Sequence, residues 1–300
     1  MSLLVTGSIG IDTVETPFGL REAVIGGSAV YFAYAASFFT PVRLVGVVGD
    51  DCPKQLLNVF DGREVDTRGL EIRHGSRTFR WHGSYLKDMN EAQTVEVSLN
   101  VLAERAAKIP PEFLDSKFVF LANTHPTIQR DTLAMLRSPR LAVADTMNLW
   151  IQTQRPELDK LLAKIDGLVL NDGEVRLLTG QKNLVDAARD VLKMGPKFVV
   201  IKKGEHGCLL MNHKDTFVLP AFPAQTVVDP TGAGDSFAGG MMGYLATQGN
   251  LSSATLKRAL AFGTVVASFT VADFSLSALA AATREQIDDR WQDFKTAMSF

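Results

Sequence analysis

The chain has 300 residues, 46% of them hydrophobic and 21% charged, so it can bury a substantial globular core. Its formal net charge of −2 and its two cysteines argue against broad nucleic-acid binding and against a disulfide framework. No basic leader opens the chain and no apolar run approaches the ~18 residues of a spanning helix, so we expect a soluble cytoplasmic protein without a membrane partner.

Short apolar runs alternate with helical patterns along the chain. The predicted strands are 3–8, 42–48, 118–121, 141–144, 167–170 and 198–201, and the predicted helices include 28–38, 127–136, 183–193 and 236–246. The strands lack clean alternation, which is typical of strands buried on both faces. This order predicts an α/β three-layer sandwich with a mostly parallel central sheet and helices on both faces. Ligands in such folds sit beyond the carboxyl ends of the strands.

The region from about 70 to 101 breaks this order because it shows strand and turn patterns without a helix. Residues 78–85 alternate, with Phe79, Trp81 and Tyr85 on one face. A turn at 87–90 would let 94–99 return antiparallel. A small β-sheet of this kind can close over a site and exclude water. Without repeats or linkers, we expect one domain, 1–300, with a lid from about 13–25 and 70–101.

The stretch 229–235, with sequence DPTGAGD and called here the glycine-rich turn, carries most of the functional argument. Gly232 and Gly234, with Ala233 between them, permit a tight turn and the close approach of a ligand. The helix predicted directly afterwards would direct its free N–H groups and its positive dipole end at an anion such as phosphate. Asp235 could then take the proton from a substrate hydroxyl, although a plain helix N-cap is the alternative.

Two other nucleotide motifs are absent from the sequence. No G-x-x-x-x-G-K-[ST] occurs, which argues against a P-loop NTPase. No G-x-G-x-x-G follows the first strand and opens a helix, so a nicotinamide-dependent oxidoreductase is poorly supported. A kinase and a non-catalytic nucleotide sensor remain.

The glycine-rich turn resembles the signature of the ribokinase-like (PfkB) family of carbohydrate and nucleoside kinases. Other family-like segments follow in the expected order across nearly the whole chain. The resemblance implies the ribokinase-like form of the three-layer fold and an enzyme that uses ATP and Mg²⁺. It implies that Asp235 is the catalytic base, and that the turn of Gly232, Ala233 and Gly234 stabilises the developing charge.

On the acceptor side, the resemblance implies that Asp12, just beyond the first strand, binds substrate hydroxyls, with an ordinary turn aspartate as the alternative. Gly26 and Gly27 look like the diglycine that lets the backbone approach the acceptor. Tyr31 stands where many family members have asparagine, so this chain departs from the standard ribokinase sugar pocket.

On the nucleotide side, Asn171 and Glu174 match an N-x-x-E motif, in which Glu174 would organise Mg²⁺ through water. Residues 202–207, KKGEHG, resemble a loop in which Gly204 and Gly207 admit ATP. Lys202 or Lys203 would lie near the phosphates, and a solvated turn is the alternative.

Three further residues complete the implied site. Thr231 belongs to the turn that meets ATP, and Gly263 lies in a segment that corresponds to the helix beside the adenine, where helix packing is the alternative. Relatives often bind a monovalent cation near the residue that corresponds to Asp229. Because 272–275 lacks the usual glycine, K⁺ is left open.

The lid gives the best indication of the acceptor. Phe79 and Trp81 could stack on a nucleobase, or they could simply pack the lid onto the domain. Tyr31, beside the diglycine, also favours a nucleoside. We therefore prefer a nucleoside phosphorylated on its ribose 5′-hydroxyl over a free sugar such as ribose or fructose. A monomer and a lid-mediated homodimer are both compatible with the sequence.

Overall fold

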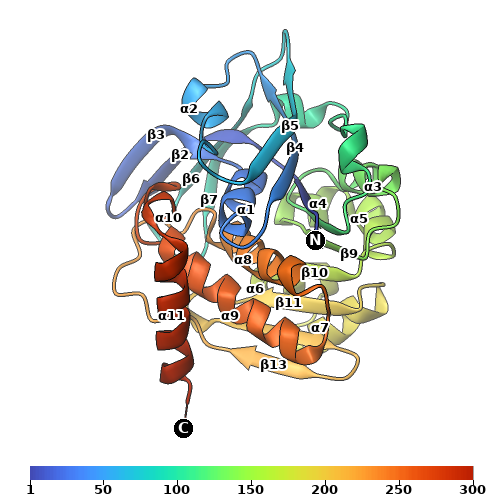
Figure 1. Ribbon diagram of the computed structural model, residues 1–300, viewed down its shortest axis with the longest axis vertical. Helices are drawn as coiled ribbons and strands as arrows, with labels where there is room; N and C mark the ends of the chain where they lie inside the picture. Colours follow the sequence, from blue (N-terminus) through green and yellow to red (C-terminus); the bar gives the residue numbers. More distant parts are fainter. Residues whose placement is uncertain (300) are drawn as a thin grey trace.

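The computed structural model describes residues 1–299 and contains a large and a small β-sheet (Figure 1). The large sheet has nine strands in the order β13-β12-β11-β10-β9-β8-β1-β4-β5. Only β12 and β13, at one edge of this sheet, run antiparallel to their neighbours. The strands are β1 (Leu3–Thr6), β4 (Val42–Gly49), β5 (Val65–Arg73), β8 (Phe118–Leu121), β9 (Leu141–Asp145), β10 (Gly167–Asn171), β11 (Phe198–Lys202), β12 (Cys208–Asn212) and β13 (Thr216–Leu219).

The predicted α/β class is confirmed, and all six predicted strands are present with ends within two residues of those expected. The sequence did not predict β12 and β13. Residues 70–73 were expected in the lid, but they belong to β5, which pairs in parallel with β4. That boundary was wrong because half-buried edge strands and lid strands carry the same alternating pattern.

Helices cover both faces of the large sheet, and each face has its own buried cluster. Leu3 and Val5 of β1 point into one cluster and Leu4 into the other, as expected for strands buried on both sides. The first face is covered by α1 (Ser28–Ala36), α2 (Lys54–Leu57), α8 (Ala233–Gln248), α9 (Ser253–Thr270), α10 (Ser277–Ala281) and α11 (Arg284–Ala297). The second is covered by α3 (Pro126–Met135), α4 (Asn148–Thr153), α5 (Arg155–Leu162), α6 (Asp172–Thr179) and α7 (Leu184–Lys193).

The small sheet, called here the lid, has the strand order β3-β2-β6-β7 and lies to one side of the large sheet (Figure 1). Its strands are β2 (Gly10–Thr16), β3 (Gly19–Gly26), β6 (Phe79–Ser84) and β7 (Gln93–Ser98). β6 and β7 form the predicted antiparallel hairpin. β2 pairs with β6 in parallel, which joins this hairpin to the β2–β3 hairpin near the chain start. Three short 3₁₀ turns complete the fold: Asn100–Ala103, Pro111–Phe113 and Gly204–His206.

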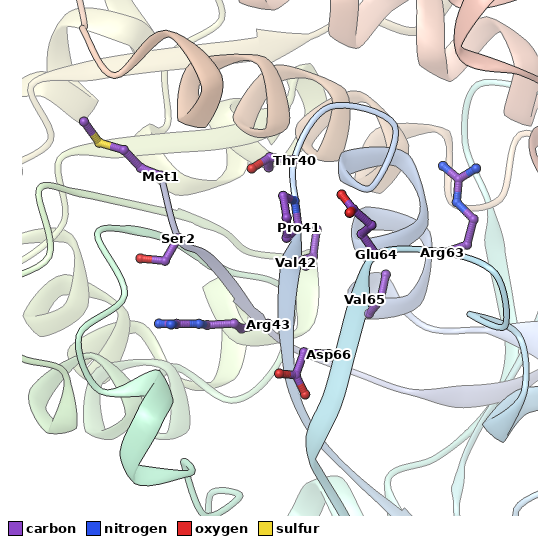
Figure 2. Close-up of a pocket in the computed structure, with 10 residues that line it drawn as sticks. All are labelled: Met1, Ser2, Thr40, Pro41, Val42, Arg43, Arg63, Glu64, Val65 and Asp66. Atoms are coloured by element: carbon purple, nitrogen blue, oxygen red, sulfur yellow. The ribbon is translucent and has the colours of Figure 1, made fainter.

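A pocket of about 560 Å³ opens at the amino ends of β4 and β5, opposite the edge where parallel sheets bind ligands (Figure 2). Arg43 and Arg63 line it, but their side chains point in different directions. Arg43 pairs with Asp115, and the Arg63 guanidinium lies over the ring of Phe38. The two arginines therefore do not converge on one anion. Within residues 1–299, none of the helices has the length and apolar character needed to cross a bilayer.

Candidate active site

The glycine-rich turn leads into α8 three residues earlier than predicted. Gly232, at φ 73°, is the N-cap, so Ala233, Gly234 and Asp235 form the first helical turn. The N–H of Ala233 donates to the Pro230 carbonyl (3.2 Å). Within residues 1–299, the N–H groups of Gly234 and Asp235 have no acceptor in another residue. These two amides and the positive end of the helix form an anion site.

The two glycines of the turn are required by two different neighbours. A Cβ on Gly232 would lie 2.4 Å from the ring of Tyr31, and the positive φ would add strain. A Cβ on Gly234 would lie 2.5 Å from the ammonium nitrogen of Lys202. Tyr31, predicted to bind substrate, is 1% exposed and instead supports the turn from beneath.

Asp235 remains half-buried at the start of α8, so its carboxylate is reachable. Burial raises the pKa of this carboxyl from 3.8 to about 6, while the Lys202 ammonium and its own backbone amide lower it. A carboxylate with this pKa is largely ionised at neutral pH and is basic enough to take a proton from a hydroxyl. Of the three amides that the sequence analysis expected at the phosphate, those of Gly234 and Asp235 are free, whereas the Ala233 amide is bonded to Pro230.

Asp12 lies on β2, buried to 4% exposure, and its carboxylate packs directly on Gly26. A Cβ on Gly26 would come within 1.9 Å of Asp12 Oδ2, so this glycine makes room for the acid. Gly27 has φ 102° and precedes α1, and its backbone amide lowers the pKa of Asp12 slightly against the larger effect of burial. The Oδ1 atom has no hydrogen-bond partner within residues 1–299. Burial, then Asp229 and Asp235, raise the pKa of Asp12 to about 8.

Asn171 and Glu174 form the capping box of α6. The Asn171 N–H donates to Glu174 Oε2 and the Glu174 N–H donates to Asn171 Oδ1, both at 2.7 Å. This leaves Glu174 Oε1 free, and burial raises the pKa of the carboxyl. Asn171 itself is exposed at the carboxyl end of β10.

Asp145 is a carboxylate that the sequence analysis did not select. It is the last residue of β9, it is buried, and its Oδ1 has no partner within residues 1–299. Burial and the nearby Asp235 raise its pKa well above 3.8. An acid directly after a buried parallel strand was the available signal.

Magnesium fits this set of carboxylates. The unpartnered Asp145 Oδ1 and the free Glu174 Oε1 are hard oxygen donors, which Mg²⁺ prefers, and it commonly keeps several of its waters. Within residues 1–299, no cluster of three acid, histidine or cysteine ligands forms a closed metal cage. The site thus resembles those in which substrate phosphates and water complete the metal's coordination.

The loop after β11 contacts the lid. Gly204 (φ 52°) is the first residue of a 3₁₀ turn, and Gly207 (φ 78°) follows its last residue. Glu205 N–H donates to Asn90 Oδ1 (3.2 Å) and Asn90 Nδ2 donates to Glu205 Oε1 (3.1 Å), which ties the lid to this loop. A Cβ on Gly207 would meet the Leu219 carbonyl at 2.0 Å, so strand packing also requires that glycine. Lys203 follows the strand and is half-buried.

Three other predicted residues have structural contacts. Gly263 faces Phe237 across the α8–α9 contact, where a Cβ would lie 2.6 Å from the Phe237 carbonyl, so the helix-packing alternative describes it. Asp229 accepts the N–H groups of Thr231 (2.8 Å) and Ser275 (3.0 Å) with its two oxygens, and is fully buried. The Thr231 hydroxyl donates to the Tyr85 hydroxyl (3.3 Å), so it braces the lid.

The aromatic residues of the lid have different surroundings. Phe79 packs over Gly10 and against the second core cluster, as the packing alternative predicted. Tyr85 is buried in a small cluster with Val14 and Phe274. Trp81 is partly exposed and packs against this same cluster, and a Cβ on Gly83 would come within 1.9 Å of its indole.

A protein-family model matches most of this chain. The model of the "pfkB family carbohydrate kinase" matches residues 22–282, which is most of the chain. The chain belongs to the pfkB family. It is therefore a phosphotransferase with an alcohol group as acceptor.

Relatives of this pfkB chain act on more than one class of acceptor. A cytidine kinase of Thermococcus kodakarensis is 32% identical over 252 residues, 81% of this chain and 88% of the relative. A 2-dehydro-3-deoxygluconokinase of Escherichia coli is 25% identical over 300 residues, 88% of this chain and 94% of the relative. A Burkholderia thailandensis nucleoside kinase solved with ADP-inosine has a TM-score of 0.79 at 18% identity, covering 99% and 96% of the two chains.

Replacing the predicted base tests its role in this pfkB enzyme. General-base assistance contributes about 10²- to 10⁴-fold, so Asp235→Asn should lower kcat by at least about 100-fold. Because burial raises the pKa of this carboxyl, the neutral amide should raise the unfolding midpoint at neutral pH, so the lost activity would not come from unfolding. Steady-state kinetics and thermal unfolding measure both effects. Near-normal turnover of Asp235→Asn would show that Asp235 is not the catalytic base.

The pH dependence tests the protonation state of Asp235. Its pKa of about 6 means that the base is ionised above this pH and protonated below it. We expect kcat/KM to fall about tenfold per unit below about pH 6. A profile of kcat/KM from pH 4.5 to 8 checks this. An acidic limb near pH 4 would contradict the raised pKa.

The burial of Asp12 should reduce stability as pH rises. The pKa of Asp12 is about 8 in the folded protein and 3.8 in the unfolded chain. The free energy of unfolding therefore falls as the pH rises from about 4 to about 8. Asp12→Asn cannot ionise, and should be more stable than wild type by on the order of a few kcal/mol at pH 8, but not at pH 4. Urea unfolding of both proteins measures this. The expectation would be contradicted if the free energies of unfolding of the two proteins changed in parallel with pH.

Proposed function

We propose that this protein transfers the γ-phosphoryl group of ATP to the 5′-hydroxyl of a nucleoside. The observation that carries the proposal is a row of side chains across the lid. Asp12 of β2 pairs with Trp81 of β6, and Trp81 pairs with Val97 of β7. Partners in register share a face of the sheet, so the three lie side by side.

This row changes from polar to apolar along its length. Asp12 is buried beside the glycine-rich turn, Trp81 is partly exposed, and Val97 is 43% exposed. A ribose hydroxyl suits the free Asp12 oxygen, and a flat base suits the indole and the valine next to it. A free sugar would use the carboxylate but would leave the apolar part of the row uncovered.

The relatives support the same choice. The cytidine kinase covers most of this chain at 32% identity, and the nucleoside kinase solved with ADP-inosine has the same fold. The 2-dehydro-3-deoxygluconokinase, at 25% identity, keeps a free sugar or sugar acid as the alternative acceptor. A non-catalytic sensor is disfavoured because both Asp12 and Asp235 are present.

The residues present account for the reaction. Asp12 binds the ribose hydroxyls and orients the nucleoside over the turn. Asp235 takes the proton of the 5′-hydroxyl as its oxygen attacks the γ-phosphorus, and ADP leaves with the electrons of the broken P–O bond. The amides of Gly234 and Asp235 stabilise the charge on the moving group. Mg²⁺, held near Glu174 and Asp145, would neutralise phosphate charge.

Two ancillary predictions remain part of this proposal. Potassium at Asp229 is tested by comparing turnover in K⁺ and tetramethylammonium salts. Because lid strands β3 and β7 are edge strands, a lid-mediated dimer stays an alternative to a monomer, and sedimentation distinguishes them.

A screen of acceptors tests the function. ATP consumption should be seen with cytidine, adenosine or inosine, and should be much weaker with ribose, fructose and 2-dehydro-3-deoxygluconate. The product should be a 5′-phosphate by ³¹P NMR, and the 5′-deoxy analogue of the best nucleoside should not be phosphorylated. Preference for the sugars or the sugar acid would overturn the nucleoside proposal and leave the kinase assignment intact.

Trp81→Ala tests the stacking role. Base stacking on an aromatic is worth about 1–3 kcal/mol, so KM for the nucleoside should rise about 5- to 150-fold. Trp81→Phe should retain most of the affinity. Leu86→Ala, at a side chain that is 55% exposed on the same lid, is the matched control and should change nothing. An unchanged nucleoside KM in Trp81→Ala would show that the nucleobase does not stack on Trp81.

A further inference from the structure

Lys202 is the last residue of β11, and the strand determines where its side chain points. Phe198 and Val200 face the cluster that contains α8, whereas Val199 and Ile201 face the opposite cluster. Lys202, two residues beyond Val200, therefore lies on the α8 side. It pairs with Asn171 of β10 and Cys208 of β12, so neighbours on both sides fix its backbone.

The ammonium of Lys202 lies against the first turn of α8. It occupies the space that a side chain at Gly234 would need, 2.5 Å from the Cβ position. The free amides of Gly234 and Asp235 are in this same turn. A lysine cation and the positive end of a helix are thus side by side, an arrangement that is unfavourable unless negative charge lies between them.

The carboxylates nearby do not pair with this ammonium. The charge of Lys202 lowers the pKa of three carboxyls, those of Asp145, Glu174 and Asp235. Even so, within residues 1–299 the Lys202 ammonium makes no ion pair within 4.0 Å and no hydrogen bond, although other lysines such as Lys160, Lys193 and Lys197 each have an acidic partner. The charge is therefore held in place by the fold and available to a ligand.

We propose that Lys202 is a catalytic residue whose ammonium donates hydrogen bonds to the oxygens of the phosphoryl group during transfer. It acts together with the amides of Gly234 and Asp235. The second glycine of the turn then has a specific purpose, because its missing side chain admits the ammonium. The proposal rests on the phosphoryl-transfer part of the proposed function and not on the choice of a nucleoside.

The chemistry balances without a proton change on Lys202. The acceptor oxygen forms a bond to the γ-phosphorus, and the bond from that phosphorus to the bridging oxygen of ADP breaks. The hydroxyl proton goes to Asp235, and ADP takes the bonding electrons. Lys202 stays protonated and stabilises charge on the transferring group, which is where such a donor contributes most.

Lys202→Met tests this inference, with Lys202→Arg as the conservative variant. Loss of one preorganised donor costs about 10²- to 10³-fold in kcat. We expect that fall with the acceptor KM within about threefold of wild type, and partial recovery in the arginine variant. Lys197→Met, at the amino end of the same strand, is the matched control and should keep full activity.

Nucleotide binding gives a readout that needs no acceptor. Calorimetry with Mg²⁺ and either ADP or the ATP analogue AMP-PNP should show Lys202→Met losing at least about fivefold more affinity for AMP-PNP than for ADP. A merely structural role would weaken both nucleotides equally and would lower the unfolding midpoint.

Three results would overturn the proposal: kcat of Lys202→Met within about threefold of wild type, equal losses for the two nucleotides, or the loss appearing in Lys203→Met instead. Failure of the nucleoside proposal looks different. In that case the wild-type enzyme would not phosphorylate nucleosides, while the AMP-PNP and ADP measurements would still assess Lys202.

Discussion

The concentration of carboxylates at one edge of the sheet is the constraint on which this structure depends. Asp12, Asp145, Glu174 and Asp229 are all buried there, and Asp235 is half-buried beside them. Burial is the largest cause of the raised pKa of every one of these groups. Such a cluster is costly for the protein alone, and a bound cation would offset that cost. The free amides of α8 and the ammonium of Lys202 are the fixed positive groups that face it.

One of these carboxylates holds the site together. Asp229 bonds the amides of Thr231 and Ser275, which joins the glycine-rich turn to the chain after α9. The Ser275 hydroxyl then donates to the carbonyl of Ile25 at the base of the lid (2.6 Å). The Tyr85 hydroxyl, which receives the bond from Thr231, reaches the same turn from the other lid hairpin. Lid and turn are therefore connected through buried polar contacts, so a movement of the lid would disturb the turn.

The lid also meets the loop after β11 through Asn90 and Glu205, which are separated by 115 residues in the chain. In a pfkB kinase, whose acceptor is an alcohol, contacts of this kind between a lid and the main body can help to exclude water.

Much of the fold was predictable because buried parallel strands and their helices have strong local patterns. The strand ending at Leu121 and the helix beginning near Asn183 were found within a residue or two. The start of α8 was misplaced because a glycine at positive φ can begin a helix at the next residue, and the sequence does not state φ. Residues 70–73 were assigned to the wrong sheet because strand pairing over long distances has no local signal.

The sequence by itself determined the α/β class, through its buried strands and helical patterns, and the family, through two glycines followed by an acid in the glycine-rich turn. Only the tertiary structure decided which neighbours each residue has. It placed Lys202 against Gly234, Tyr31 beneath Gly232, and Trp81 beside Asp12. The reason is that local pattern fixes the direction of a side chain along its own strand or helix, whereas its partners come from elements that are distant in the chain.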